Sequence, residues 1–503
     1  MFEMRSRRFV GFLSFCGALV TAPLLGCSGV EETVSPVTQP PKVAFAPCED
    51  NANIECGVLD VPVDHDAPDG PKMSVPVVRV PALDETKRIG SLFLNPGGPG
   101  GSGVSLAKGA SIFFPVDLRE RFDFIGFDPR GEANSTPSID CVDSLDAFIA
   151  LDTTPDDAAE RKALTEVTSA FVAGCQSKSG DILAHIGTDS IVRDIDLLRQ
   201  ALGEEKLTYL GYSYGTFLGA IYADTFPDHV RALVLDGPVD PSLTNEQFIE
   251  GQSYAFEAEL EQMLTWCEGS DDCVLGKDTD PPTSPSDLFD EVKATIEKTP
   301  VPSSLYVGRT AGPGEFAYAV SGALYQPGRW AELAQALSDA AKGDSTGLLD
   351  LSNAYTGRYP DGSYDNSLEV YYAVTSLDSP SSHDPSALVD LLTKVKKKAP
   401  RIGAYLPYTA LPAEVWPLPN WREAVPVEAK GAPPILVVGS TRDPATPYEW
   451  AQSLTKQLPG AALLTREGDG HTSFGRGNDC IDKAVTDYLV SGALPDTGTI
   501  CAD

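Results

Sequence analysis

Residues 206–227, "KLTYLGYSYGTFLGAIYADTFP", constrain the fold of this chain more than any other segment. A short apolar run predicts a buried strand, and the run after it has the spacing of a helix. Ser213 lies between Gly211 and Gly215, and such small residues allow a sharp turn that lifts a hydroxyl above a sheet. Because a serine hydroxyl is a weak nucleophile by itself, the rest of the chain must supply a base and an acid. Without them, Ser213 is only a hydroxyl in a tight turn.

Eight apolar runs along the chain predict strands, and helical patterns lie between them. The first two runs alternate apolar and polar residues, as half-exposed antiparallel strands do. The other six are continuous, as in a parallel sheet that is buried on both faces. The runs are 55–65, 72–83, 88–98, 121–131, 206–215, 230–240, 433–443 and 461–471. This pattern predicts an α/β protein with an eight-stranded, mostly parallel sheet.

The long gap between the sixth and seventh runs predicts an inserted, mostly helical cap, residues 241–425. Helix-like segments joined by loops rich in Pro, Gly and Ser fill this gap, and no apolar run of the buried-strand type stands out there. The sheet-containing core would then consist of residues 45–240 and 426–503. These boundaries are predictions from pattern alone.

The predicted base is His471, which follows the last apolar run in the glycine-rich stretch "EGDGHTSFGRG". In sheets of this type the acid precedes the histidine and follows the serine in chain order. Asp443, at the end of the preceding run, fits the acid that would orient the imidazole. Asp236, after the sixth run, is the alternative acid.

A negatively charged intermediate at Ser213 would need two backbone N–H donors, which form an oxyanion hole. Tyr214, directly after the serine, is the first predicted donor. The second is Gly98, in the glycine-rich stretch "LFLNPGGPGGSG" (92–103), with Gly97 as the close alternative. A phosphate site is a weaker interpretation of this loop, since no Lys-Ser/Thr pair follows it.

The N-terminus resembles a bacterial export signal. Arginines precede an apolar stretch that ends in "LLGC", which predicts a signal peptide over 1–26 and lipidation of Cys27. An ordinary signal peptide cut nearby is the alternative. Residues 27–44 are rich in Ser, Thr and Pro and predict a flexible tether. The protein is therefore expected in the cell envelope or outside the cell.

The formal net charge of −34 argues against nucleic acid or an anionic membrane surface as a partner. Solubility of a secreted protein is the simpler explanation of this charge. Membrane contact is expected only through the lipid anchor, and the sequence does not indicate an oligomeric state.

Cysteine usage also favours export. Setting aside Cys16 and Cys27, the order of the others suggests four local disulfides in an oxidising compartment. No CxxC pair occurs and histidines do not cluster near cysteines, so no metal site is predicted. The expected pairs are Cys48–Cys56, Cys141–Cys175, Cys267–Cys273 and Cys480–Cys501.

Six motifs together resemble the tripeptidyl aminopeptidase-like branch of the α/β-hydrolases, which is related to prolyl aminopeptidases. The resemblance implies a serine hydrolase that acts near the free N-terminus of a peptide, or on ester and amide substrates, without a cofactor. It also assigns Ser213, Asp443 and His471 to a catalytic triad. The motifs are "NPGGPGGSG" (95–103), "GFDPRGEANST" (126–136), "GYSYGT" (211–216), "LVLDGPVDP" (233–241), "DPATP" (443–447) and "GHTSFGRGNDC" (470–480).

Departures from the family pattern concern specificity. Ala133 stands where the family usually has glycine, and Ser376 and Ala413 stand where a pair of cap cysteines is expected. Glu132 is a candidate to bind the substrate ammonium group, since carboxylates bind such groups. A carboxylesterase with the same triad and a non-catalytic envelope binding protein are the alternative functions.

Overall fold

The computed structural model describes residues 42–277 and 279–503. The predicted signal peptide, Cys27 and nearly all of the predicted tether lie outside these residues. Within the described ranges, none of the helices combines the length and the apolar composition that a membrane span requires.

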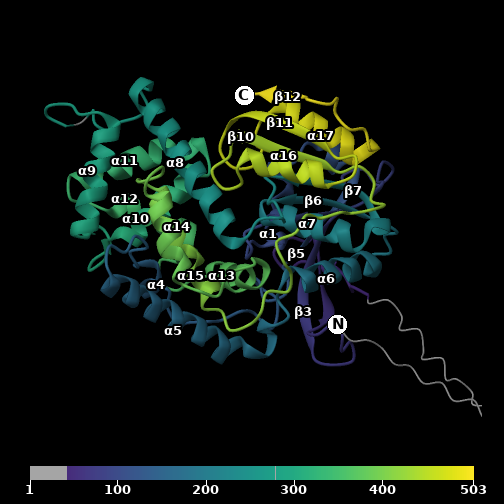
Figure 1. Cartoon of the computed structure of the whole chain (residues 1–503). Coiled ribbons are helices and arrows are strands. Elements are labelled where there is room, and N and C mark those ends of the chain that lie inside the picture. Colours follow the sequence, from purple (N-terminus) through teal and green to yellow (C-terminus); the bar gives the residue numbers. More distant parts are fainter. Residues whose placement is uncertain (1–41, 278) are drawn as a thin grey trace, which may run out of the picture. The chain divides into compact units, whose positions relative to one another are not determined.

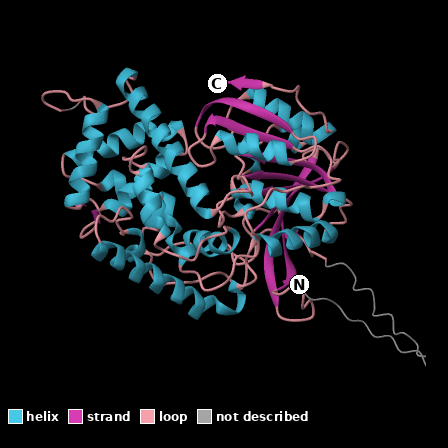
Figure 2. Ribbon diagram, in the orientation of Figure 1, coloured by secondary structure: helices cyan, strands magenta, loops and turns pink. Residues whose placement is uncertain are grey.

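A ten-stranded sheet forms the centre of the described chain, in the order β1-β2-β3-β5-β4-β6-β7-β10-β11-β12 (Figures 1 and 2). Eight of these strands are the predicted runs. The two additional strands, β1 and β12, are short edge strands that the prediction of eight strands omits. The strands are β1 (Ala46–Pro47), β2 (Glu55–Pro62), β3 (Lys72–Val80), β4 (Gly90–Asn95), β5 (Phe122–Phe127), β6 (Leu207–Tyr212), β7 (Val230–Asp236), β10 (Leu436–Arg442), β11 (Ala462–Asp469) and β12 (Ile500–Ala502).

Strand direction follows the hydrophobic pattern. β2 and β3 pair antiparallel, with Val58 opposite Pro76, and β3 is antiparallel to β5. From β5 across to β12 every neighbouring pair is parallel. The carboxyl ends of the central strands therefore lie at one edge of the sheet, where loops of this architecture carry functional groups.

Helices cover both faces of the sheet (Figure 2). In β4, Phe93 packs into one hydrophobic cluster, while Leu92 and Leu94 pack into the cluster on the opposite face. This alternation explains why a strand buried on both faces is continuously apolar. The first cluster includes residues of α6 (Thr188–Ala201), α7 (Tyr214–Thr225) and α16 (Tyr448–Gln457), and the second includes residues of α1 (Gly103–Lys108) and α17 (Asp479–Ser491).

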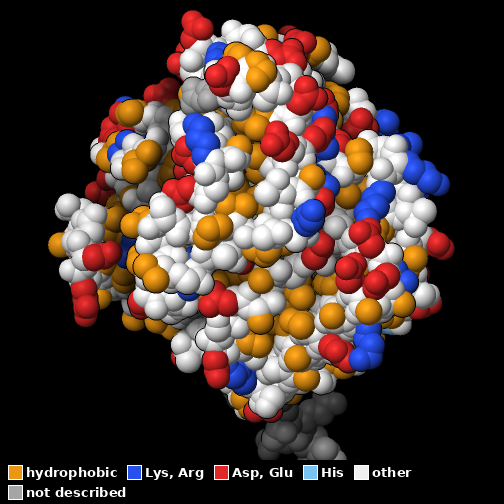
Figure 3. Space-filling view, turned by 90° about the vertical axis from the view of Figure 1, so that its left-hand side faces the viewer, with side chains coloured by type: hydrophobic (Ala, Val, Ile, Leu, Met, Phe, Trp, Pro, Cys, Tyr) orange, Lys and Arg blue, Asp and Glu red, His pale blue; other side chains and the backbone are white. Residues whose placement is uncertain are grey.

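The chain between β7 and β10 is mostly helical and has a hydrophobic cluster of its own. Among its described residues, the only strands form a short hairpin, β8 (Val301–Pro302) and β9 (Thr310–Ala311). Acidic and basic side chains are interspersed on the face of this region that Figure 3 shows, so negative charge does not form one patch there. The helices are α8 (Asn245–Gly269), α9 (Pro285–Lys298), α10 (Pro313–Leu324), α11 (Trp330–Ala341), α12 (Thr346–Thr356), α13 (Ser367–Asp378), α14 (Ala387–Val395) and α15 (Leu411–Glu414).

Two earlier helices also belong to this region. α4 (Asp146–Ile149) and α5 (Ala158–Leu183) precede Ser213 in the chain but lie beside the helices of the 241–425 segment (Figure 1). Leu164 of α5 joins the hydrophobic cluster of that segment. The helical layer is therefore built from two stretches of sequence rather than from residues 241–425 alone.

Four disulfides join the cysteine pairs that the sequence order suggests. Each closes a local loop, with sequence separations of 6 to 34 between partners. The bridge Cys141–Cys175 fastens α5 to the loop that follows β5, and Cys480–Cys501 fastens β12 to α17.

Candidate active site

Ser213 occupies a strained turn between β6 and α7. Its backbone has φ 53° and ψ −123°, a conformation that L-residues rarely adopt and that often marks functional sites. A Cβ at Gly211 would lie 2.3 Å from the carbonyl oxygen of Gly215, so the turn can close only with glycine there. The Ser213 N–H donates to the carbonyl of Asp236 at 2.9 Å, which fixes the turn against β7.

Asp443 and His471 meet in the loops that follow β10 and β11. His471 Nδ1 lies 2.9 Å from each carboxylate oxygen of Asp443. The carboxylate also accepts the N–H groups of Ala445 and Thr446, at 2.9 and 2.8 Å, and is 3% exposed. These bonds hold the carboxylate in one orientation toward the imidazole.

The other ring nitrogen of His471, Nε2, is buried and has no hydrogen-bond partner among the described residues. The ring packs edge-on against the ring of Tyr325. The backbone N–H of His471 also donates to the Tyr325 carbonyl at 2.8 Å. Ser213 and His471 line the same cavity, although no hydrogen bond joins them. Such bonds often form only when substrate is bound.

Asp236, the alternative acid, does not contact the imidazole through a hydrogen bond. Its fully buried carboxylate accepts the N–H of Phe474 at 2.7 Å and that of Ser473 at 2.9 Å. Burial raises the pKa of Asp236 to about 6. Asp236 therefore supports the loop after His471, while Asp443 is the carboxylate placed against the ring.

Two backbone N–H groups near Ser213 are unoccupied. Those of Gly98 and Tyr214 form no hydrogen bond within the described chain, whereas the Gly97 N–H donates to Asn95 Oδ1 at 2.8 Å. A Cβ at Gly97 would lie 2.4 Å from the Tyr212 carbonyl oxygen and 3.0 Å from the Tyr214 nitrogen. The glycine-rich loop (92–103) thus packs directly on the turn that contains Ser213. Because the Gly97 N–H is already bonded, the geometry favours Gly98 over Gly97 as the second oxyanion donor.

The Tyr214 side chain anchors this turn to the helical region. Its hydroxyl lies 2.5 Å from Thr188 Oγ1 and 3.2 Å from Asp378 Oδ2. Asp378, at the end of α13, also accepts from Trp421 Nε1, and burial raises its pKa to about 6. This network could not be predicted from the sequence, because its members are far apart in the chain and carry no common motif.

Glu132 lies beneath the glycine loop. It is 1% exposed, and its Oε2 accepts the Gly100 N–H at 3.0 Å. Burial raises its pKa well above the usual range. Glu132 does not line the cavity that Ser213 enters, so its position fits support of the loop rather than contact with a substrate ammonium.

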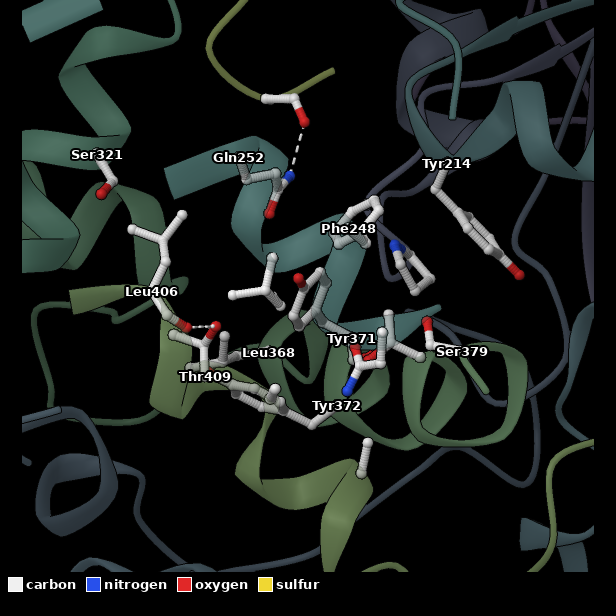
Figure 4. Close-up of a pocket in the computed structure, with 18 of the residues that line it drawn as sticks. Tyr214, Phe248, Gln252, Ser321, Leu368, Tyr371, Tyr372, Ser379, Leu406 and Thr409 are labelled. Atoms are coloured by element: carbon white, nitrogen blue, oxygen red, sulfur yellow. Dashed lines mark hydrogen bonds between the residues drawn. The ribbon is translucent and has the colours of Figure 1, made fainter. Parts of the chain in front are cut away.

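The cavity above Ser213 has a volume of about 510 Å³ and is lined mainly by aromatic and aliphatic side chains. It extends from Tyr214 at one end to Ser321 and Leu406 at the other (Figure 4). Asp240 and Asp378 line it, as does Arg422, whose guanidinium donates to the Pro241 carbonyl. Besides His471, these are its charged side chains, so the fixed charge is slightly negative.

Glu259 of α8 is a buried carboxyl group near the His471 loop. It is 1% exposed, and neither oxygen has a hydrogen-bond partner among the described residues. Burial, with the nearby negative charges of Asp469 and Asp443, raises its pKa to about 9. The carboxyl group is therefore neutral in the folded protein at pH 7.

We expect Glu259→Gln to stabilise the protein above neutral pH. Between the unfolded pKa of 4.5 and the folded pKa of about 9, the folded state keeps a proton that the unfolded chain loses, so wild-type stability falls as pH rises. Glutamine is neutral throughout. The free energy of unfolding of the variant should exceed that of wild type by about 1–3 kcal/mol at pH 8. At pH 4.5 the two proteins should be equally stable.

Urea denaturation at pH 4.5, 6 and 8 measures this difference. Glu268→Gln, an exposed position on the same helix, is the matched control and should show no pH-dependent gain. A gain for Glu259→Gln that is the same at all three pH values would contradict the buried, protonated carboxyl.

Comparison with known proteins identifies the family. A family model described as "TAP-like protein" matches residues 399–501. "Serine protease Hip1" of Mycobacterium tuberculosis is 35% identical over 510 residues, covering 96% of each chain. "Carboxylesterase B" of the same organism is 35% identical over 509 residues, covering 96% of this chain and 95% of that protein. "Tripeptidyl aminopeptidase" of Streptomyces lividans is 33% identical over 458 residues, covering 89% and 84%.

The sheet order and these relatives define the protein as a serine hydrolase with the α/β-hydrolase fold. More narrowly, the chain belongs to the TAP-like family of these enzymes, as the sequence resemblance predicts.

Proposed function

We propose that this protein is an exported aminopeptidase that releases short peptides, of two or three residues, from free N-termini. Ser213, His471 and Asp443 are its catalytic residues in this proposal. The observation that carries it is the His471 ring, held at Nδ1 by Asp443 and unpaired at Nε2, in the wall of the cavity that Ser213 also lines.

Each group has one role in the reaction. Ser213 Oγ attacks the scissile carbonyl while His471 Nε2 takes its proton, and the same proton then goes to the leaving amine. Asp443 accepts the Nδ1–H and stabilises the imidazolium. The N–H groups of Tyr214 and Gly98 hold the oxyanion. Water next hydrolyses the acyl-enzyme and regenerates the free serine, and this scheme needs no metal or cofactor.

Two observations support a peptide with a free amine as substrate. Among the relatives, one is named a tripeptidyl aminopeptidase and another a serine protease. The slightly negative cavity, with Asp240 and Asp378 in its wall, suits a cationic N-terminus better than an anionic ligand. A third relative is named a carboxylesterase, which keeps ester hydrolysis with the same residues as the second candidate.

We also propose that the protein is exported and held in the cell envelope by a lipid on Cys27. Four disulfides support an oxidising compartment, because such bridges are rare where thiols are kept reduced. Incorporation of a labelled fatty acid into wild type and not into Cys27→Ala would support the anchor. Equal labelling of both would exclude Cys27 as the attachment site.

Peptide anilides with free and acetylated amines test the substrate proposal. We expect acetylation of a tripeptidyl anilide to lower kcat/KM by about 100-fold or more, because the blocked amine carries no charge. A simple acyl ester measured in parallel gives the esterase activity. Equal turnover of free and blocked peptides would refute the aminopeptidase assignment. If only the ester were cleaved, the carboxylesterase candidate would replace it.

A further inference from the structure

The helical region between β7 and β10 contacts both loops that carry the proposed acid and base. Tyr325, directly after α10, accepts the His471 N–H with its backbone carbonyl at 2.8 Å. Gln252 of α8 donates from Nε2 to the Ala445 carbonyl at 2.7 Å, the bond drawn at Gln252 in Figure 4. Ala445 belongs to the loop after β10 that carries Asp443. Both loops are therefore fastened to helices that lie outside the sheet.

The sheet-containing core contacts the imidazole at Nδ1 and Cε1. Asp443 lies at Nδ1, and Thr446 Oγ1 is 3.3 Å from the same nitrogen. The Gly237 backbone lies close to Cε1, since a Cβ built on it would be 3.1 Å from that atom of His471. These contacts reach adjacent ring atoms, and hydrogen bonds at a single nitrogen still allow a ring to tilt about it.

The Tyr325 side chain adds a contact from the helical region. Its ring lies edge-on to the His471 ring, with the centroids 5.2 Å apart and an angle of 88° between the planes. Aromatic pairs favour such an arrangement over a face-to-face one. The Tyr325 ring also packs against the rings of Phe256 and Tyr355, with centroids 5.6 and 5.7 Å away. A tilt of the imidazole would therefore disturb a packed aromatic cluster.

Glycine at position 470 allows the helical region to come this close. Gly470 has φ +91°, and a Cβ built on it would lie 2.7 Å from Pro327 Cδ and 3.1 Å from the Tyr325 carbonyl oxygen. A side chain here would push residues 325–327 away from the loop that carries His471. The packing of Tyr325 on the base thus depends on a glycine in the core.

Gln252 reaches the acid through one peptide group. The carbonyl of Ala445 and the N–H of Thr446 belong to the same peptide group, and this N–H donates to Asp443 Oδ1 at 2.8 Å. Hydrogen bonds in a chain polarise one another, so a bond to the carbonyl strengthens the N–H as a donor. Gln252 therefore supports a donor that orients the Asp443 carboxylate.

We propose that Tyr325 and Gln252 are positioning residues, through which the helical region holds the His471–Asp443 pair in its reactive orientation. Neither residue exchanges a proton. Tyr325 limits the tilt of the imidazole, and Gln252 supports the loop that orients the carboxylate. This inference rests on the catalytic roles proposed above, and it makes the reactivity of the core residues depend on the placement of the helical region.

The rate at which a fluorophosphonate labels Ser213 tests this proposal without a peptide substrate. The rate constant reports how well the serine is activated, and the final stoichiometry reports the fraction of folded protein. We expect Tyr325→Leu to lower the rate constant about 10- to 100-fold and Gln252→Met to lower it about 3- to 10-fold, because small displacements of catalytic groups are costly. Both variants should still reach one adduct per chain. Their kcat for an acyl ester should fall by similar factors, with little change in KM.

Two further variants separate positioning from folding. Tyr325→Phe keeps the aromatic ring and should recover most of the rate that Tyr325→Leu loses. Phe316→Leu changes another aromatic residue of α10, which is fully buried against Phe289 and lies outside the cavity wall. This control should lower the thermal stability of the protein and leave the rate constant for labelling unchanged.

Labelling of Tyr325→Leu at the wild-type rate would overturn the inference. Incomplete labelling of Tyr325→Leu at that rate, or an equally slow Phe316→Leu, would also overturn it, because either result indicates a general loss of structure. The substrate proposal fails separately. If wild type reacts with the probe and cleaves an ester but no peptide anilide, the aminopeptidase function is refuted, while the labelling rates still decide the roles of Tyr325 and Gln252.

Discussion

Replacement of Ser213 by alanine is expected to lower kcat for a peptide anilide by about 10⁵- to 10⁶-fold. Ser213 lines the cavity from a strained turn, and Tyr214 and Gly98, the proposed oxyanion donors, line the same cavity. The oxyanion hole and binding remain in the variant, so turnover about 10³- to 10⁴-fold above the uncatalysed rate should persist.

Ser473→Ala is the matched control for this substitution. Ser473 follows His471 closely in the chain, and its buried hydroxyl lies 3.0 Å from Ser440 Oγ, outside the cavity. The kcat of the Ser473→Ala variant should remain within a few-fold of the wild-type value. Steady-state kinetics and circular dichroism on both variants separate lost chemistry from lost folding. A Ser213→Ala protein with one-tenth of the wild-type activity would require a different nucleophile.

Asp443→Asn should produce the second largest loss, about 10³- to 10⁴-fold in kcat. An amide at this position no longer stabilises the imidazolium, and it can turn an N–H toward His471 Nδ1. The ring then presents the wrong tautomer to the serine. KM should change little, because Asp443 does not belong to the cavity wall.

Asp236→Asn distinguishes the two acidic residues. It replaces an equally buried carboxylate that holds the N–H groups of Ser473 and Phe474 but makes no bond to the imidazole. We expect this variant to lose thermal stability and to keep kcat within about 10-fold of wild type. If Asp236→Asn lost more kcat than Asp443→Asn, Asp236 would be the acid that orients His471.

Much of the fold could be predicted because its signals are local. Strands buried on both faces require continuous apolar runs, and β4, β6 and β7 show such runs. Each disulfide joins neighbouring cysteines, so sequence order alone suggests the pairs. The edge strands β1 and β12 have two and three residues, which is too short for a periodic pattern.

The site could be predicted only where chain order and strand ends define it. His471 and Asp443 follow consecutive sheet strands, β11 and β10, and the structure brings them into contact. The helical layer could not be predicted in the same way. α5 precedes Ser213 by sequence yet contributes Leu164 to the cavity, and Asn245, the first residue of α8, lines it without belonging to any motif. Their burial depends on packing between helices, which single-sequence periodicity does not specify.

Glu132 illustrates the same limit. A carboxylate in the loop motif "GFDPRGEANST" suggests a group that binds the substrate ammonium, but the chain folds Glu132 under the glycine-rich loop, where it accepts the Gly100 N–H. Whether a carboxylate points into a cavity or beneath it depends on backbone geometry around Gly100 and Gly131, both of which have positive φ. The sequence motif alone does not determine that direction.

Covalent labelling by a fluorophosphonate tests the central claim most directly. Such a probe reacts with a serine that is activated by a base and flanked by an oxyanion hole. The account predicts one adduct per chain, located by peptide mass spectrometry on Ser213, and no adduct on Ser213→Ala. Absence of an adduct on native protein, or equal labelling of the Ser213→Ala variant, would contradict it.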